Sequence, residues 1–230
     1  MKETLKEKLY RIPKWAWFLG PCYYLFQFGM YRFGDWLSHV LGTYDNVWCP
    51  KFAPIDDLFP IVPFFSVIYV YSFAFWVFAL MTVAMTKRKN FVNFIVGLCS
   101  ACLIGFLVFA IFPSYMDRVA EGVIDAAAKP GVFTFVLRCI QFFDGGDIAF
   151  DLFPSYHCIM SLYCYFGVRK QPEITKGYKV YSIIMTVLIC AACLLIKQHY
   201  FIDVISGLAI STICYIVVQR IDPSRYFIKE

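Results

Sequence analysis

Six long apolar stretches, separated by short polar segments, constrain this chain more than any other feature of its sequence. Hydrophobic residues make up 60% of the 230 residues and charged residues only 16%, a balance typical of proteins that cross a membrane several times. A helix needs roughly 17–25 apolar residues to span a bilayer. We therefore predict an all-α, polytopic membrane protein with six transmembrane helices in one bundle, a single domain over residues 1–230. The predicted helices cover residues 15–33, 61–85, 91–113, 154–168, 180–196 and 202–219.

Lysines and arginines gather in alternate connections between these stretches. Basic clusters occur in the N-terminal tail, in residues 87–89, in residues 169–179 and near the C-terminus, whereas most acidic residues fall in the other connections. The positive-inside rule places the basic side, and with it both termini, in the cytoplasm. The net charge of +5 is therefore attributed to topology and not to nucleic-acid binding. Residues 1–14 alternate apolar and charged side chains at helical spacing, which predicts an amphipathic segment on the inner membrane surface.

Two similar polar motifs occur where apolar stretches begin on the outer side of the membrane. The first is Phe153-Pro-Ser-Tyr-His157, and the second is Lys197-Gln-His-Tyr-Phe-Ile-Asp203. Polar side chains at such positions are costly and usually have a function. His199 and Asp203 are four residues apart, a spacing that puts two side chains on one face of a helix. The carboxylate could then hold one imidazole nitrogen while the other faces a substrate.

The start of the fourth predicted helix is suited to binding an anion. If the helix begins at the proline of the first motif, Ser155, Tyr156 and His157 present free backbone N–H groups at the positive end of the helix dipole. Arg118 and Lys197 supply two cations on the same membrane face, and both residue types bind phosphate oxygens. Each residue also has a simpler explanation, as a helix cap or an interfacial anchor. Their joint occurrence on one face predicts a phosphate pocket.

The two motifs carry a resemblance to a known family. PSxH followed by HxxxD resembles the last two signature motifs of the type-2 phosphatidic acid phosphatase superfamily, whose usual forms are PSGH and SRxxxxxHxxxD. The longer strings at 151–157 and 196–207 are similar to the bacterial branch that reads NxFPSxH and KQHYxxDxxxG. The resemblance covers about residues 112–207, the catalytic motif region. It implies a metal-independent lipid phosphatase or phosphotransferase without a cofactor. The charge distribution places the active site at the outer, extracytoplasmic or lumenal face.

The resemblance also implies a role for each site residue. His199 would attack phosphorus and become a phosphohistidine, while Asp203 holds its imidazole. His157 would protonate the leaving group and later activate the acceptor. The phosphate would be bound by cationic and polar groups: Arg118, Ser155, Tyr156 and Lys197. The implied partners are a membrane lipid phosphate and the bilayer.

The sequence departs from the superfamily pattern in three places. Arg118 is the only remnant of the first motif, KxxxxxxRP, whose lysine position is occupied by Ile111. Ala192-Cys193 stands where the third motif has Ser-Arg, so Lys197 is expected to supply the missing charge. Asp151 stands where the related branch often has Asn. An added carboxylate near a phosphate is unfavourable, and Asp151 could face a substrate amine, a cation or solvent.

Three functions stay open. The chain could hydrolyse a lipid phosphomonoester or diphosphate, or it could transfer a phospho-headgroup to an alcohol, as sphingomyelin and inositol phosphorylceramide synthases do. It could also bind or transport lipids without catalysis. The PSYH and KQHY strings favour hydrolysis, whereas the missing lysine and arginine of the motifs favour transfer. The intact histidines and aspartate argue against a silent binder. The lipid, its headgroup, the oligomeric state and the organism are not specified by the sequence.

The ten cysteines show no metal-binding spacing. Two CxxC pairs, at 99–102 and 190–193, fall in predicted membrane helices, where small residues commonly serve helix packing. Cys49 and Cys139 fall in outer connections and could pair in an oxidising compartment. Whether they meet is left open by the sequence.

Overall fold

The computed structural model describes residues 12–228, and the protein is mostly helical, at 72%. Within this part of the chain, four helices are long and apolar enough to cross a membrane. They are α4 (Phe65–Ala84), α5 (Arg88–Ile111), α9 (Lys176–Leu195) and α10 (Phe201–Ile221). Each begins and ends within a few residues of a predicted span. The protein is therefore a helical membrane protein, and the predicted amphipathic segment 1–14 lies almost entirely outside the described residues.

Two further helices belong to the same bundle but differ from these four. α2 (Leu19–Leu41) follows the 3-10 helix η1 (Lys14–Phe18) and carries Arg32 and Asp35, which make it more polar. α8 (Tyr156–Val168) has only 13 residues, about 20 Å of helix, and is shorter than the hydrocarbon core. It is almost completely buried, and it packs against α4, α5, α9 and α10. The predicted count of six transmembrane helices is thus not confirmed, because α8 is covered by protein and α2 is more polar than the four spans.

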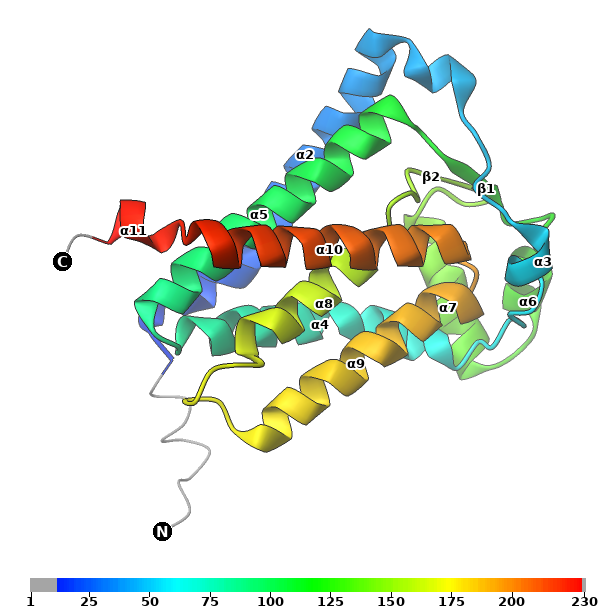
Figure 1. The fold of residues 1–230 in the computed structure, drawn as a ribbon. Helices are drawn as coiled ribbons and strands as arrows, with labels where there is room; N and C mark the ends of the chain where they lie inside the picture. Colours follow the sequence, from blue (N-terminus) through cyan, green and yellow to red (C-terminus); the bar gives the residue numbers. More distant parts are fainter. Residues whose placement is uncertain (1–11, 229–230) are drawn as a thin grey trace.

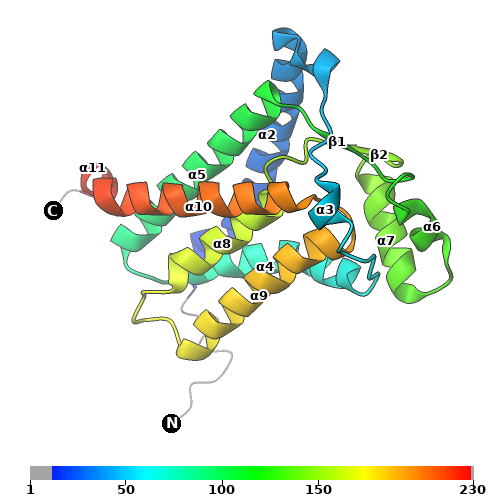
Figure 2. The same cartoon turned by 45° about the vertical axis from the view of Figure 1, so that its right-hand side comes forward.

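The connections at one end of the bundle form a cap beside the starts of α8 and α10 (Figures 1 and 2). The opposite end holds the α4–α5 and α8–α9 connections and the end of α10 (Figure 1). Short helices build most of the cap. They are η2 (Thr43–Asn46), α3 (Ala53–Asp56), α6 (Val123–Ala128) and α7 (Val132–Phe143). Near the other end of the chain, α11 (Ser224–Phe227) follows α10.

The cap also contains a small sheet, which an all-α prediction does not include. β1 (Tyr115–Asp117) pairs antiparallel with β2 (Ile148–Phe150), with Met116 opposite Ala149. Both central residues are buried, and Ser114, just before β1, forms a bridge with Trp48, in the connection between α2 and α4. Backbone groups in a connection need hydrogen-bond partners just as those in a helix do. The strand pair supplies them, and it fixes the chain on either side of α6 and α7.

Candidate active site

The first residues of α8 and α10 are held against each other at the capped end of the bundle. The backbone N–H of Ser155 donates to the carbonyl oxygen of Asp203 at 2.9 Å. Gly207, one turn further along α10, lies so close to α8 that a Cβ atom there would be 2.5 Å from the Ser155 carbonyl oxygen. Only glycine allows this approach of the two backbones. The two polar motifs therefore meet through backbone contacts.

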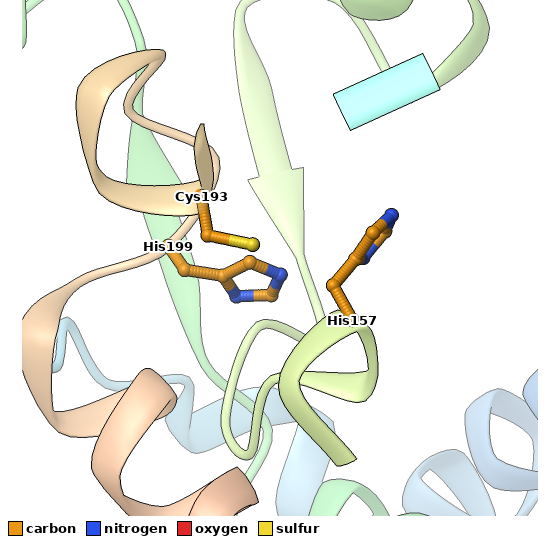
Figure 3. A group of neighbouring side chains, drawn as sticks. All are labelled: His157, Cys193 and His199. Carbon is orange, nitrogen blue, oxygen red and sulfur yellow. The ribbon is translucent and has the colours of Figure 1, made fainter. Parts of the chain in front are cut away.

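His157 and His199 come together at this junction, as Figure 3 shows. Their ring centroids are 6.0 Å apart, and the residues are 9% and 7% exposed. The predicted approach of the two histidines is therefore confirmed. The thiol of Cys193, near the end of α9, projects into the same space (Figure 3).

His199 is held through its Nδ1 atom. This nitrogen lies 3.1 Å from the carbonyl oxygen of Leu152 and 3.5 Å from Oδ2 of the fully buried Asp203. The same carboxylate oxygen accepts the backbone N–H of Tyr200 at 2.8 Å. The predicted reason for the His199–Asp203 contact is wrong, because α10 begins at Phe201 and His199 precedes it. The contact forms because Asp203, in the first helical turn, reaches back to cap the helix.

His157 is held by aromatic packing from α4. Its ring stacks on Tyr69 with centroids 4.1 Å apart, and Trp76 and Phe73 lie at 5.0 and 5.6 Å. Its Nε2 atom is buried and has no hydrogen-bond partner among the described residues. The ring is therefore fixed in place while one of its nitrogens stays free for a ligand.

Ser155 is the N-cap of α8, and its hydroxyl accepts the backbone N–H of Cys158 at 3.4 Å. The prediction that the helix begins at the proline is wrong, because Pro154 precedes the cap. The hydroxyl of Tyr156 donates to the carbonyl oxygen of Cys102 in α5. Tyr156 can therefore offer the site only its backbone N–H, and phosphate binding by Ser155 and Tyr156 stays a prediction.

Arg118 is fully buried directly after β1. Its guanidinium donates to the carbonyl oxygens of Asp144 and Gly146 at 2.9 and 2.8 Å, and it pairs with the Asp144 carboxylate. It also donates to Oε1 of Gln198 at 3.0 Å, next to His199 in the chain. These contacts place a fixed cation, with Asp144 as its counter-ion, beside residues 197–200, the turn that carries His199 and precedes α10. We call this segment the histidine turn. Its binding of phosphate stays a prediction.

Lys197 is also buried, and its ammonium already has partners. Nζ donates to the backbone carbonyl oxygen of Asp56 at 2.6 Å and lies 3.7 Å from a carboxylate oxygen of Glu121. Glu121 in turn pairs with Lys51 at 2.8 Å. Lys197 thus links the turn before α10 to the α2–α4 connection and to the segment between β1 and α6. Its proposed replacement of the missing arginine stays a prediction.

Asp56 is a residue of the site region that the sequence does not reveal. Its carboxylate is buried and accepts the backbone N–H groups of Phe52 and Phe201, both at 2.7 Å. Phe201 is the first residue of α10, so Asp56 satisfies one of the free N–H groups at the start of that helix. Two consecutive aspartates in an aromatic loop carry no recognisable motif, and only the fold gives Asp56 this role.

Four buried polar atoms around the histidines lack hydrogen-bond partners in the described part of the chain. Buried polar groups in folded proteins are nearly always paired. Unpaired donors and acceptors beside the two histidines are typical of a site for a ligand. The four atoms are Nε of Arg118, Nε2 of His157, Nε2 of Gln198 and Oδ1 of Asp203.

Asp151 lies just before the first motif with a left-handed backbone, φ 57°. Asp and Asn adopt this conformation more readily than other non-glycine residues, which explains why either can stand at this position. Burial raises the pKa of Asp151 to about 6, and the negative charge of Asp35 adds to this shift. Such a shift is opposite to the one that a paired cation would cause. The structure therefore gives no support to a cation partner for Asp151.

Cys49 and Cys139 are free thiols in this structure. Cys49 lies 3.7 Å from the hydroxyl of Tyr200, whereas Cys139 belongs to α7. The disulfide that the sequence left open is not formed here.

Comparison with known protein families identifies a superfamily for this chain. A sequence model of the PAP2 superfamily matches residues 59–217, more than half of the chain, including both histidine motifs. No curated protein and no solved structure matches the chain. The match does not distinguish the branches of the superfamily, so the bacterial branch stays a prediction.

Proposed function

Because the chain belongs to the PAP2 superfamily, we propose that it is a membrane lipid phosphate phosphatase that hydrolyses a lipid phosphomonoester or diphosphate through a phosphohistidine. Membership of the superfamily supports phosphatase or phosphotransferase chemistry in general. One observation carries the finer proposal. Two imidazoles lie with their ring centroids 6.0 Å apart, one oriented through Nδ1 and one with a nitrogen that has no partner in the described chain. This pairing suits a nucleophile and an acid–base group on opposite sides of one phosphoryl group.

In the proposed mechanism, the Leu152 carbonyl and the Asp203 carboxylate hold the proton on Nδ1 of His199. The lone pair on Nε2 is then free to attack phosphorus. The new N–P bond forms as the P–O bond to the lipid breaks, and His157 gives its proton to the leaving oxygen. His157 next accepts a proton from water. The water oxygen bonds to phosphorus, the N–P bond breaks, and free phosphate leaves.

The phosphoryl oxygens are proposed to lie against the cationic and N–H groups around the histidines. Nε of Arg118 and Nε2 of Gln198 are donors without a partner in the described chain. The backbone N–H groups at the start of α8, beside Ser155 and Tyr156, and the charge of Lys197 would add to them. Positioning and electrostatic stabilisation supply most of the catalysis in phosphoryl transfer. A metal ion is not needed in this mechanism.

The proposed topology has six membrane-crossing helices in one domain, with both termini in the cytoplasm. The basic segments 87–89 and 169–179 lie in the α4–α5 and α8–α9 connections and the first turns of α5 and α9, at the end of the bundle opposite the cap (Figure 1). The positive-inside rule then puts the cap and the histidines at the outer face. α8 can cross as a short helix because the bundle, and not lipid, surrounds it.

A phosphotransferase is the second candidate, and two observations favour it. The histidines are 9% and 7% exposed, and a site that excludes water protects a phosphoenzyme from hydrolysis. The arginine of the third motif is also replaced, by Cys193. A non-catalytic lipid binder is less well supported, because an oriented imidazole such as His199 has no purpose in it.

A turnover screen tests these alternatives. The full-length protein in detergent would be given phosphatidic acid, phosphatidylglycerophosphate and a polyprenyl diphosphate in the presence of EDTA. It would be assayed with and without diacylglycerol, ceramide or inositol as acceptor. We expect release of free phosphate without any acceptor, and no release by His199→Ala. A product that forms only with an alcohol acceptor would establish transfer. Lipid binding without turnover of any substrate would refute the enzymatic function.

A further inference from the structure

Cys193 brings a third ligand-type side chain to the two histidines (Figure 3). One ligand atom each from His157, Cys193 and His199 lie within 4.8 Å of one another. Cys193 is fully buried, and the three residues come from α8, α9 and the turn before α10. In the part of the chain that the structure describes, no other three histidine, cysteine or acidic side chains form such a group. The CxxC spacing of 190–193 gave no hint of it, because the partners of Cys193 lie on other elements.

Two imidazoles and a thiolate are suited to a zinc-like divalent cation. Nitrogen and sulfur ligands favour zinc and similar metals, whereas magnesium and calcium take oxygen ligands. Zinc–ligand bonds of about 2.0–2.3 Å in a tetrahedron put the ligand atoms roughly 3.3–3.6 Å apart. The atoms here would have to approach by about 1 Å, a shift within the range of small side-chain rotations.

Both imidazoles are held in place beside Cys193. The rings of Tyr69, Phe73 and Trp76 pack around His157. His199 has its Nδ1 against a backbone carbonyl and a carboxylate, at 3.1 and 3.5 Å. Metal-binding histidines nearly always donate their second N–H to such a group, which fixes the ring and leaves the other nitrogen for the metal. His199 is therefore oriented for a metal as well as for phosphorus.

We propose that His157, Cys193 and His199 form a binding site for zinc or a similar thiophilic divalent cation, and that this cation inhibits the enzyme. Binding forms one bond to sulfur and one to a nitrogen of each ring, and it releases the thiol proton to solvent. The fourth tetrahedral position is left for water. The inhibitory effect, though not the binding itself, rests on the function proposed above.

Inhibition follows from the atoms that the cation occupies. The metal takes the His199 lone pair that would attack phosphorus and a nitrogen of His157, the residue that would carry the proton. Metal and phosphoryl group therefore exclude each other. The superfamily pattern has an arginine where this chain has Cys193, and a guanidinium there would repel a cation. The replacement of this arginine by Cys193 thus makes the protein sensitive to zinc-like cations, a sensitivity that a protein with the arginine would lack.

Cobalt binding tests the site without any need for turnover. The purified full-length protein would be titrated with Co²⁺, whose bond to a thiolate gives a near-ultraviolet charge-transfer band. We expect one equivalent to produce the band and Zn²⁺ to abolish it. Cys193→Ser should lose the band and bind more than about 100-fold more weakly. The matched control is Cys190→Ser, one turn away on α9 and outside the group, which should keep it. The absence of a band in the wild type, its persistence in Cys193→Ser, or equal loss in both variants would overturn the site.

Inhibition is tested separately. Zn²⁺ should suppress lipid phosphate turnover reversibly with EDTA, and half-inhibition should need at least about ten-fold more zinc in Cys193→Ser than in Cys190→Ser. A rise in turnover with zinc, or a fall with EDTA, would overturn the inhibitory role. An intact cobalt band in a protein that turns over no lipid phosphate would refute the proposed function and leave the metal site standing. Turnover of a lipid phosphate by a protein without a cobalt band would refute the metal site and leave the proposed function standing.

Discussion

His157 and His199 lie close together but are held by different kinds of contact. His157 is packed against Tyr69 and its neighbours on α4, and its Nε2 has no partner in the described chain. His199 is held through Nδ1 by the Leu152 carbonyl and the Asp203 carboxylate. Packing fixes the position of a ring without fixing its protonation state, whereas hydrogen bonds to one nitrogen select a tautomer. His157 is therefore suited to exchange protons, and His199 to present a lone pair.

The groups that surround the two histidines also differ, in their polarity. The α8 side is lined by the rings of Tyr69, Phe73 and Trp76. The α10 side carries charged groups, with Arg118 and Lys197 close to the histidine turn in the chain or in space. Electrostatic interactions are strong in a buried site of low polarity. We infer that proton transfer belongs to the α8 side and charge stabilisation to the α10 side.

The largest expected effect separates the two histidines directly. His199→Ala should abolish turnover and phosphoenzyme formation for every substrate, because no nucleophile remains. His157→Ala removes only proton transfer, typically worth about 10²–10⁴-fold. Its defect should be smaller for an aryl phosphate than for an alkyl phosphate, since an aryl oxygen leaves without a proton.

Rapid-quench trapping of the acid-labile phosphoenzyme, with the two leaving groups compared, provides the measurement. Wild-type protein and His39→Ala, the variant of the third histidine, serve as controls. Label on His199→Ala would reverse the assignment. An equal defect of His157→Ala for both leaving groups would remove the proposed acid–base role.

A second, smaller effect tests whether Asp203 adds more than orientation. Asp203→Asn keeps an oxygen that can cap α10 at Tyr200 but removes the negative charge. The Leu152 carbonyl still accepts from Nδ1 of His199, so orientation should persist. We expect kcat to fall by about 10²-fold, equal to roughly 2.7 kcal/mol of transition-state stabilisation.

Single-turnover rates would be measured for Asp203→Asn and Asp203→Ala. The alanine variant also loses the helix cap, worth about 0.5–2 kcal/mol of stability, so its melting temperature should fall further. If the asparagine variant is as inactive as His199→Ala, the carbonyl does not orient the ring. If its rate is unchanged, Asp203 is only a cap.

A third effect concerns the charge on the α10 side. Lys197→Ala should weaken vanadate binding by about ten-fold or more, as expected for a lost charged hydrogen bond, and Lys197→Arg should retain part of the affinity. Lys51→Ala is the matched control, because Lys51 pairs with the same Glu121 at 2.8 Å but belongs to the connection between α2 and α4. Vanadate inhibition constants provide the comparison. Equal losses of vanadate affinity in the two alanine variants would mean that Lys197 acts through Glu121. An unchanged affinity in Lys197→Ala would mean that Lys197 is only an interfacial anchor.

Much of the helix arrangement could be predicted because a membrane helix depends on a local property, the length of an apolar run. The predicted spans 61–85 and 91–113 correspond to α4 (Phe65–Ala84) and α5 (Arg88–Ile111). The short α8 shows the limit of this reasoning, since burial in protein and burial in lipid demand the same apolar residues. The strands of the cap carry no such signal, because three residues are too few to show an alternating pattern.

The meeting of the two histidines could also be predicted, whereas the cause of the His199–Asp203 contact could not. The spacing of His199 and Asp203 suggested a shared helix face, whereas the contact arises from a cap that reaches back. The contacts of Asp56 and Cys193 could not be predicted, because their partners lie far away in the chain. Side-chain chemistry can be read from a motif, but a contact between separate elements depends on how the whole bundle packs.

The smallest expected effect on catalysis lies before the first motif, at Asp151. Its carboxyl has a pKa of about 6 in the folded protein, against about 3.9 in an unfolded chain. The folded state therefore binds this proton more tightly, so the contribution to stability is full below about pH 4 and is lost as pH rises through 6. At pH 7.5 the ionised carboxylate should lower the free energy of unfolding by about 1–3 kcal/mol.

Asp151→Asn tests this expectation, because it keeps the left-handed backbone and removes the buried charge. Its melting temperature should exceed that of the wild type at pH 7.5 and match it at pH 4, with turnover nearly unchanged. Asp35→Asn, which removes only the neighbouring charge, should give a smaller gain. Equal melting temperatures of wild type and Asp151→Asn at pH 7.5 would show that the carboxylate has a favourable partner, and the α8 side would then carry charge like the α10 side.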